Sequence, residues 1–266
     1  MKRHIFSFTA EQLIPYVDWS YFFHAWDIKR KDYSTDEAGK LKQEAIALMQ
    51  QSGHCEALFA LCDARSQGED IIIEGHRLPL LRQQHSDPHK PNLCLSDFIS
   101  PVADKIGLFA TTTKMTVADS SDPYHTLLAQ TAADRMSEAA ASLMHRMIRT
   151  DSELWGYSPD ENLTIEEINL EKFQGIRPAV GYPSLPDQSI IFIIDDILRL
   201  NDIGITLTSG GMMQPHASVC GVIFAHSQSR YFNVGTISNE QLTDYAQRRA
   251  LPVEEIRKYL ARNIDQ

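Results

Sequence analysis

The sequence predicts an α+β protein in which a twisted antiparallel sheet is flanked by helices. Two pairs of apolar segments are each joined by a polar turn, which is typical of β-hairpins. These pairs are 57–62 with 70–74, and 217–225 with 231–235. A third observation is an apolar stripe at helical spacing from Pro123 to Arg149. Because no internal repeat, low-complexity segment or flexible linker interrupts the chain, we expect residues 1–266 to form a single domain.

The first fifty residues are expected to form an arm and two helices. Residues 1–15 show little periodicity and are assigned to the arm. Aromatic residues then recur at i, i+3, i+4 and i+7, which predicts a helix containing Trp19, Phe22, Phe23 and Trp26. Asp18 stands at the N-cap position of this helix, where its carboxylate can accept hydrogen bonds from the first turn. A second helix is expected over residues 35–51, closed near Gly53.

The middle of the chain is dominated by the long helix. Before it we expect a short helix over 78–84, a loop holding Pro88 and Pro91, and a strand over 106–113. The apolar stripe of the long helix consists of Leu128, Ala132, Met136, Ala139, Leu143 and Met147. Glu138 lies roughly 130° from the centre of that stripe, at about 100° per residue. The pattern alone therefore favours an exposed carboxylate that pairs with Arg135.

Capping signals organise the last hundred residues. A capping box at 164–167 begins a short helix that is expected to reach Phe173, and a buried helix over 190–200 is expected to end at Gly204. A second capping box at 238–241 opens a helix to Arg249. Pro252 is placed as the first residue of the last helix.

Composition excludes several classes of function. The chain has 35 Asp and Glu against 25 Lys and Arg, and a net charge of −10 disfavours nucleic acid, whose phosphates need a basic surface. This balance fits a small cationic or zwitterionic ligand, or a basic protein partner. The four cysteines form no C-x-x-C pair and the histidines no H-E-x-x-H motif, so no metal site is expected. There is no apolar run of the roughly 18 residues that a membrane span needs, and no signal-peptide pattern, so we expect a cytoplasmic protein without a membrane partner.

A stretch rich in proline and glycine, residues 175–187, lies between two helical segments, and we call it the ribbon. Its three prolines fix φ and remove three backbone donors, while its glycines allow close approaches that a side chain would prevent. Such a stiff segment can hold Arg177 and Tyr182 in one geometry. It can equally be a rigid connector, and the pattern leaves both interpretations open.

Within the ribbon, Arg-Pro-Ala at 177–179, Gly-Tyr-Pro at 181–183 and Pro-Asp at 186–187 resemble the signature of the activation domain of cobalamin-dependent methionine synthase. Further segments resemble motifs of that family in the same order: Asp18-Trp19, 95–98, 106–110, 133–139, 155–157, 217–221, Tyr231-Phe232 and 241–249. Residues 183–188 lack the Cys and His of the family motif, and residues 211–216 lack its tryptophan. The resemblance covers nearly the whole chain and implies a C-shaped α+β fold that consists of this domain alone.

The resemblance implies a function in reductive methylation. The domain would bind S-adenosylmethionine in a shallow cleft and present it to cob(II)alamin carried by a partner methionine synthase. One electron from a flavodoxin-like donor gives cob(I)alamin, which takes the methyl group and leaves S-adenosylhomocysteine. Because cob(I)alamin is a strong nucleophile and the methyl group is activated, the domain mainly positions its ligand. That fits the lack of a Ser/His/Asp triad or a catalytic carboxylate pair in the sequence.

The resemblance also implies charged ligand-binding residues. Arg177 is expected to hold the carboxylate of the ligand in a charge-assisted bond. Asp18 and Glu138 are expected to face its α-ammonium group or ribose. Each residue has a structural alternative, which is an N-cap for Asp18, an ion pair with Arg135 for Glu138, and a buried ion pair for Arg177.

The remaining site residues are aromatic or belong to the ribbon backbone. Tyr182 is expected to be the catalytic residue, and it lines the cleft near the methyl group together with the backbone of Gly181 and Pro183. Tyr231 and Phe232 are expected to offer aromatic faces to the adenine or the cation. For Tyr231 the alternative is a structural aromatic of a hairpin.

Two other functions remain open at this point. The chain could be a catalytically silent module that binds S-adenosylmethionine or docks a partner. It could also activate a different corrinoid methyltransferase.

Overall fold

The computed structural model describes residues 1–84, 89–115 and 122–264. At its centre is a six-stranded sheet in the order β4-β3-β2-β5-β8, and β1 pairs with β2 on the same edge as β3. All of its pairings are antiparallel, as the sequence predicts. The strands are β1 (Lys2–Thr9), β2 (His54–Gln67), β3 (Asp70–Ile73), β4 (His76–Pro79), β5 (Asp104–Lys114) and β8 (Ser218–Ile223). A separate two-stranded sheet pairs β6 (Thr206–Leu207) with β7 (Met213–Gln214).

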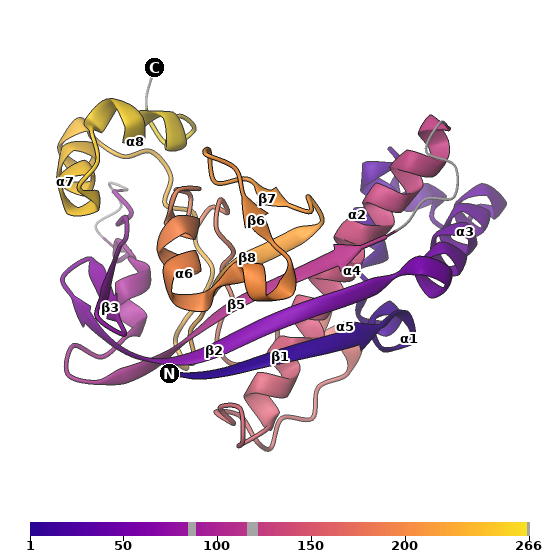
Figure 1. The fold of residues 1–266 in the computed structure, drawn as a ribbon, viewed down its shortest axis with the longest axis horizontal. Coiled ribbons are helices and arrows are strands. Elements are labelled where there is room, and N and C mark those ends of the chain that lie inside the picture. The colour runs from indigo at the N-terminus through magenta and orange to yellow at the C-terminus, as the bar shows by residue number, and fades with distance from the viewer. Residues whose placement is uncertain (85–88, 116–121, 265–266) are drawn as a thin grey trace.

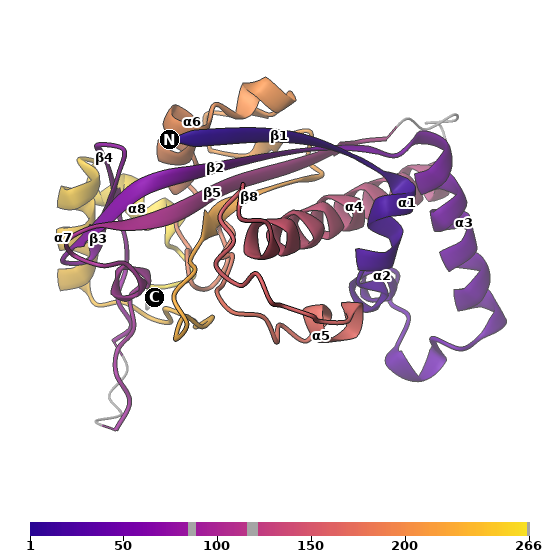
Figure 2. The same cartoon turned by 90° about the horizontal axis from the view of Figure 1, so that it is seen from below.

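Helices cover both faces and both ends of the sheet (Figures 1 and 2). The long helix α4 (Pro123–Thr150) lies on one face and α6 (Ile190–Leu198) on the other. One end carries α1 (Ala10–Leu13), α2 (Trp19–Ala25) and α3 (Asp36–Ser52), and the other carries α7 (Asn239–Arg249) and α8 (Val253–Tyr259). The short helix α5 is Ile165–Asn169, and 3-10 turns occupy Ile14–Tyr16, Arg30–Asp32, Leu95–Phe98 and Leu200–Ile203. The two ends extend to the same side of the sheet, which gives the C shape (Figure 1).

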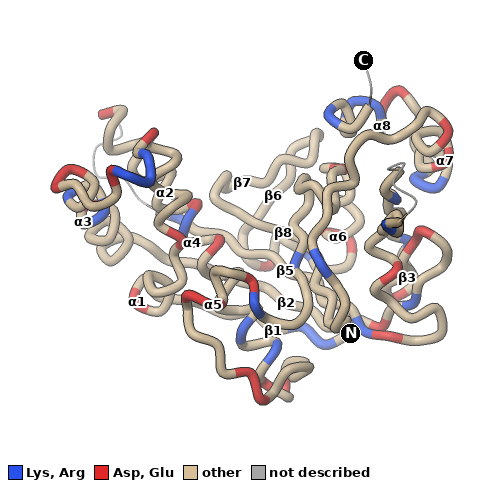
Figure 3. Tube along the Cα trace, turned by 180° about the vertical axis from the view of Figure 1, so that it is seen from behind, with Lys and Arg blue, Asp and Glu red and all other residues tan. Residues whose placement is uncertain are grey.

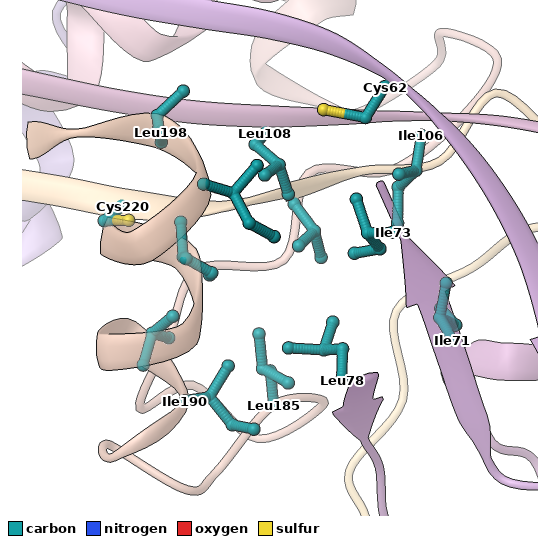
Figure 4. Close-up of a cluster of buried hydrophobic side chains, with 14 of the residues drawn as sticks. Cys62, Ile71, Ile73, Leu78, Ile106, Leu108, Leu185, Ile190, Leu198 and Cys220 are labelled. Atoms are coloured by element: carbon teal, nitrogen blue, oxygen red, sulfur yellow. The ribbon is translucent and has the colours of Figure 1, made fainter. Parts of the chain in front are cut away.

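Alternating side chains of the central strands build a core on each face of the sheet. Leu108 packs toward Ile190 and Leu198 of α6 (Figure 4), and Leu58 belongs to the same cluster. Phe59, the next residue along β2, belongs instead to the core on the α4 side. Because both faces are covered, β2 and β5 read as nearly continuous apolar runs. This covering by two layers fixes α4 against the sheet, and α4 in turn carries one wall of the cleft described below.

The prediction for residues 1–15 is wrong, because β1 occupies most of that segment. The inward-facing side chains of β1 are His4, Phe6 and Phe8, whose rings stack along the strand at 6.1 and 5.9 Å. Ile5 points outward and is exposed. A polar residue in the buried row and an apolar one in the exposed row hide the two-residue period that identifies a strand.

Other boundaries also differ from the predictions. In place of a helix over 78–84, β4 pairs with β3, and the chain is irregular from residue 80 to 84. Pro88, assigned to the following loop, lies outside the described residues. Helix α5 ends at Asn169 rather than Phe173, and α6 ends where Arg199 takes a left-handed conformation rather than at Gly204. Pro252 is the N-cap of α8 instead of its first residue.

The predicted hairpin of 217–225 with 231–235 is also wrong. The first segment forms β8, but the second runs beside the ribbon, where the Val234 N–H donates to the Pro183 carbonyl at 3.0 Å. The outer edge of β8 is already occupied by the ribbon. The Val222 N–H donates to the Pro178 carbonyl at 3.1 Å, and the Val180 N–H to the Cys220 carbonyl at 2.9 Å. The ribbon therefore closes an edge of the sheet that would otherwise be open.

Gly221 of β8 permits this close approach of the ribbon. A Cβ atom at this position would lie 2.2 Å from the Pro178 carbonyl oxygen and 2.8 Å from the Ala179 Cα. Because these two obstacles are backbone atoms, and the Phe109 ring lies at 2.9 Å as well, Gly221→Ala must push the ribbon away from β8, at an expected cost of about 2 kcal/mol in the free energy of unfolding. Urea unfolding measures this change.

Gly39→Ala is the matched control, because nothing lies within 4 Å of a Cβ at that position on α3. This control should be stabilising by about 0.5 kcal/mol or more through helix propensity. Equal stability of Gly221→Ala and wild type would contradict the observed packing of the ribbon.

None of the helices in the described part of the chain is long and apolar enough to cross a bilayer.

Candidate functional site

An open cleft of about 880 Å³ lies between the helices α2 and α4 on one side and the ribbon on the other. Five segments that are distant in sequence line it: 16–21, 135–142, 168–171, 177–184 and 231–232. The predicted residues Asp18, Glu138, Arg177, Tyr182, Pro183, Tyr231 and Phe232 all line this cleft. The fold therefore brings together side chains that the sequence separates by more than two hundred positions.

Arg177 is anchored at both its backbone and its side chain. Its N–H donates to the Tyr231 hydroxyl at 3.0 Å, and its Nη2 donates to Ser142 Oγ at 2.8 Å. Its Nη1 lies 3.9 Å from Glu138 Oε2, and its Nε has no hydrogen-bond partner. Only 20% of the side chain is exposed. The guanidinium is thus held at the cleft through its backbone and one terminal nitrogen.

Glu138 contacts ribbon residues instead of its helical neighbour. Its Oε1 accepts a hydrogen bond from the Tyr182 hydroxyl at 3.0 Å, while its Oε2 is the atom near Arg177. Arg135 lies over the ring of Tyr21, with 5.7 Å between its Cζ and the ring centroid. The helical ion pair that the pattern favoured is replaced by contacts across the cleft, because the ribbon packs against this face of α4.

Asp18 is both a helix cap and a residue of the cleft. It is the N-cap of α2, and its Oδ1 accepts from the Ser20 N–H at 2.9 Å. It also lines the cleft. A capping carboxylate uses one oxygen on the helix and leaves the other available to a ligand, so the two roles are compatible.

The ribbon turns sharply at Tyr182, which is 53% exposed. The Leu185 N–H donates to the Tyr182 carbonyl at 2.8 Å, and the Gly181 N–H donates to the Leu185 carbonyl at 2.8 Å. Gly181 has a φ of +84°, which favours glycine, and it shapes the turn without itself lining the cleft. Beyond the turn, the buried Asp187 accepts from the Tyr245 hydroxyl of α7 at 2.7 Å. The turn that carries Tyr182 is therefore held between β8 and the C-terminal helices.

The segment that holds Tyr231 and Phe232 runs beside the ribbon and does not form the predicted hairpin with β8. The Tyr231 hydroxyl accepts from the Arg177 backbone, and the Phe232 N–H donates to Ser184 Oγ at 3.1 Å. Burial raises the pKa of Tyr231, so its phenol remains neutral near pH 7. The two aromatic residues are consequently fixed to the same segment as Arg177.

Comparison with known proteins identifies this arrangement. The family described as "Vitamin B12 dependent methionine synthase, activation domain" matches residues 9–250. The chain belongs to this family. A solved structure of the MetH reactivation domain bound to AdoHcy has a TM-score of 0.91 to this activation domain at 31% sequence identity. The alignment covers 100% of this chain and 91% of that one.

Sequence reasoning missed several residues that line the cleft of this activation domain. These are Tyr16, Ser20, Tyr21, Arg135, Ser142, Ile168, Asn169, Leu170, Glu171, Pro178, Ala179 and Ser184. Ser142 and Arg135 lie four residues after and three residues before Glu138, so the helical period could have placed them on the same face. Burial raises the pKa of Glu171, and the positive charge of Arg177 partly opposes that rise. Nothing in the pattern around Glu171 indicated a cleft position, because the sequence predicts a helix as far as Phe173, whereas α5 ends at Asn169 and Glu171 lies in the loop after it.

Acidic and basic side chains are interspersed along the chain of this activation domain (Figure 3). Three carboxylates (Asp18, Glu138, Glu171) and two guanidiniums (Arg135, Arg177) line the cleft, which leaves one excess negative charge. Both signs are therefore present, with a balance that favours a cation. Within the residues that the structure describes, no group of three His, Cys, Asp or Glu side chains could hold a metal ion.

The hydroxyl of Tyr182 is expected to remain protonated well into alkaline solution. Its partial withdrawal from water, the charge of Glu138 and the hydrogen bond to that carboxylate raise its pKa to about 12. A pKa above the unfolded value of about 10 means that this interaction stabilises the fold below that pH and is lost as the pH rises toward 12. Glu138→Gln should lower the pKa of Tyr182 but leave it above the ordinary value, because the partial burial persists.

Ultraviolet titration of phenol ionisation tests this, with Tyr182→Phe identifying the contribution of this residue. Coincident titration curves for wild type and Glu138→Gln would show that the two side chains are not coupled.

Proposed function

We propose that this protein binds S-adenosylmethionine in the cleft and presents it for reductive methylation of cob(II)alamin carried by a partner methionine synthase. The observation that supports this most is an open cleft in which the Arg177 guanidinium of the ribbon faces the carboxylates of Glu138 and Asp18 on the opposite wall, in a chain of the activation-domain family. The related MetH reactivation domain was crystallised with AdoHcy, the compound that S-adenosylmethionine becomes when it loses its methyl group.

The charge of the cleft matches the charge of the proposed ligand. S-Adenosylmethionine carries one carboxylate, one ammonium and one sulfonium group, and so has a net charge of +1. The five charged side chains of the cleft sum to −1. Loss of the methyl group removes the sulfonium charge, so the product S-adenosylhomocysteine should be held less strongly by electrostatic attraction. The cleft thus favours the methyl donor over its product.

Each end of the ligand has a counterpart in the cleft. Arg177 would bind the carboxylate, since a guanidinium offers paired donors that fit a carboxylate. Glu138 and Asp18 would accept from the ammonium group or the ribose hydroxyls. Tyr231 and Phe232 would lie against the adenine or the cation.

The ribbon turn would place the methyl group at the mouth of the cleft. We propose that Tyr182 and the backbone of Pro183 line the position of the methyl group, and that Gly181 contributes only by shaping the turn. Because the Tyr182 phenol stays neutral, it adds no negative charge that would repel an electron-rich cobalt. Tyr182 would therefore act by shape and hydrogen bonding rather than by proton transfer.

The reaction balances with one external electron. An electron from a flavodoxin-like donor reduces cob(II)alamin to cob(I)alamin on the partner. The cobalt electron pair then attacks the methyl carbon, the carbon–sulfur bond breaks, and its electron pair remains on the sulfur of S-adenosylhomocysteine. In this proposal residues 1–266 act as one domain in the cytoplasm, without nucleic acid or membrane partners.

A reductive methylation assay tests the proposal. The protein is mixed with a methionine synthase fragment that carries cob(II)alamin, together with S-adenosylmethionine and a reduced flavodoxin, and methylcobalamin is followed by its absorbance. Formation of methylcobalamin that depends on the protein is the expected result. Binding of S-adenosylmethionine without methylcobalamin formation would instead identify a catalytically silent binding module. Activity only with a different corrinoid protein would show that the partner is not methionine synthase.

A further inference from the structure

Ser142 of α4 is the side chain that contacts the Arg177 guanidinium most closely. The distance from its Oγ to Nη2 is 2.8 Å, whereas the nearest carboxylate oxygen, on Glu138, is 3.9 Å from Nη1. A separation of 3.9 Å is too long for a hydrogen bond, so Glu138 attracts the guanidinium without engaging it. The polar group that fixes the direction of the Arg177 side chain is therefore a neutral hydroxyl.

Ser142 and Glu138 occupy adjacent turns of the same rigid helix. They are four residues apart on α4 and both line the cleft, while the opposite side of α4 is buried against the sheet through Met136 and Ala140. The hydroxyl and the carboxylate are thus fixed relative to each other. Arg177 reaches this pair from the ribbon, whose backbone is held in turn by the Tyr231 hydroxyl.

This arrangement has a consequence for a ligand that carries both charges. If the guanidinium were free to approach Glu138 more closely, their long ion pair would become a hydrogen-bonded one, and each group would lose capacity to bind the opposite charge of a zwitterion. A hydroxyl can hold the guanidinium aside without neutralising it, because it accepts a hydrogen bond but carries no charge.

We propose that Ser142 is a positioning residue that keeps Arg177 separated from Glu138, so that the cleft accepts the α-amino-acid end of its ligand. This inference rests on the proposed binding of S-adenosylmethionine and extends it to a residue outside the matched motif positions. The cleft would recognise one feature of the ligand, a carboxylate and an ammonium group on the same carbon.

Calorimetric titration of Ser142→Ala with two ligands tests the role. S-Adenosylmethionine should bind about five- to tenfold more weakly than to wild type, the effect of one ordinary hydrogen bond, because the hydroxyl acts on the ligand only through Arg177. Decarboxylated S-adenosylmethionine keeps the ammonium group and lacks the carboxylate, so its affinity should change less than twofold. Because alanine favours helix more than serine does, the variant is expected to fold.

Ser52→Ala is the matched control. Ser52 is also a half-buried helical serine, and its Oγ donates to the Leu48 carbonyl at 3.1 Å on α3, away from the cleft. This variant should bind both ligands as wild type does. Ser142→Thr keeps the hydroxyl and should restore binding of S-adenosylmethionine to within about twofold of wild type.

The outcomes separate this inference from the proposed function. Unchanged affinity of Ser142→Ala for S-adenosylmethionine, or an equal loss for both ligands, would overturn the positioning role while leaving the proposed function intact. If wild type bound neither ligand, the proposed function itself would fail.

Discussion

Arg177→Ala is expected to weaken the binding of S-adenosylmethionine by about 30- to 150-fold, which corresponds to ~2–3 kcal/mol. The size of the effect follows from the environment of the guanidinium. Its side chain is 20% exposed, and its backbone and one terminal nitrogen are fixed. A carboxylate that binds there meets a donor whose position is already set, so little conformational entropy is lost on binding.

Arg177→Lys distinguishes charge from geometry. Lysine keeps the positive charge but loses the planar pair of donors, so an intermediate loss of about tenfold is expected. Arg199→Ala is the control, because Arg199 is a largely exposed residue at the end of α6 that pairs only with Asp202 among the described residues. Binding by Arg177→Ala at wild-type affinity would show that the ligand carboxylate is held elsewhere.

Glu161→Gln is expected to lower the free energy of unfolding by about 3–5 kcal/mol. Glu161 forms two hydrogen bonds with Arg149 of α4, at 2.6 Å to Nε and 2.7 Å to Nη2. Their side chains are 4% and 0% exposed, and the Arg149 guanidinium also lies over the ring of Phe173. Removing the negative charge leaves an arginine buried without a counter-ion, and burial without compensation is what makes the loss large.

The Arg149–Glu161 pair also joins α4 to the segment that leads into the ribbon. Next to it, His145 of α4 lies 2.8 Å from the Tyr157 hydroxyl, and burial, with Arg149 and Arg177 nearby, lowers the pKa of His145 well below its ordinary value. A Cβ at Gly175 would meet that hydroxyl at 2.8 Å. Glu161→Gln should therefore weaken ligand binding as well as stability.

Urea unfolding followed by far-ultraviolet circular dichroism measures the effect of Glu161→Gln. Asp63→Asn serves as the control, because it removes an exposed carboxylate that pairs with Lys105, and its unfolding midpoint should match wild type. Equal midpoints for Glu161→Gln and wild type would mean that the buried pair is replaceable by an uncharged hydrogen bond.

Helices with one continuous apolar face, and local capping motifs, could be predicted accurately from the sequence. The helix expected from Pro123 to Arg149 is observed over Pro123–Thr150, since its apolar stripe packs on α2 and α3 near Leu128 and on the sheet from Ala132 onward. The capping box at Thr164 forms as expected, because it depends only on residues three positions apart. Local chemistry of this kind does not require knowledge of the fold.

Elements whose partners are distant could not be predicted from local pattern. The segment around Tyr231 has the composition of a strand, but the edge of β8 that it would need is occupied by the ribbon. Glu138 offers the clearest case in the site. Its helical spacing indicates Arg135, whereas packing brings it to Tyr182 and near Arg177, about forty residues away.

The candidate site was predictable only where a motif could be matched. Asp18, Arg177 and Tyr231 stand in recognisable motifs, and the structure gathers them in one cleft. Ser142 and Glu171 stand in no such motif. The helical period links Ser142 to Glu138, whereas the position of Glu171 emerges only from the way the loop after α5 faces the cleft.

A crystal structure of this protein with S-adenosylhomocysteine tests the central claim most directly. The account predicts the ligand in the cleft, with its carboxylate within hydrogen-bond distance of the Arg177 guanidinium and its ammonium group close to Glu138 or Asp18. Arg177 should still contact Ser142, and the sulfur should lie beside the Tyr182 turn. A ligand bound at another surface, or a cleft that stays empty at saturating ligand while Arg177 pairs directly with Glu138, would contradict it.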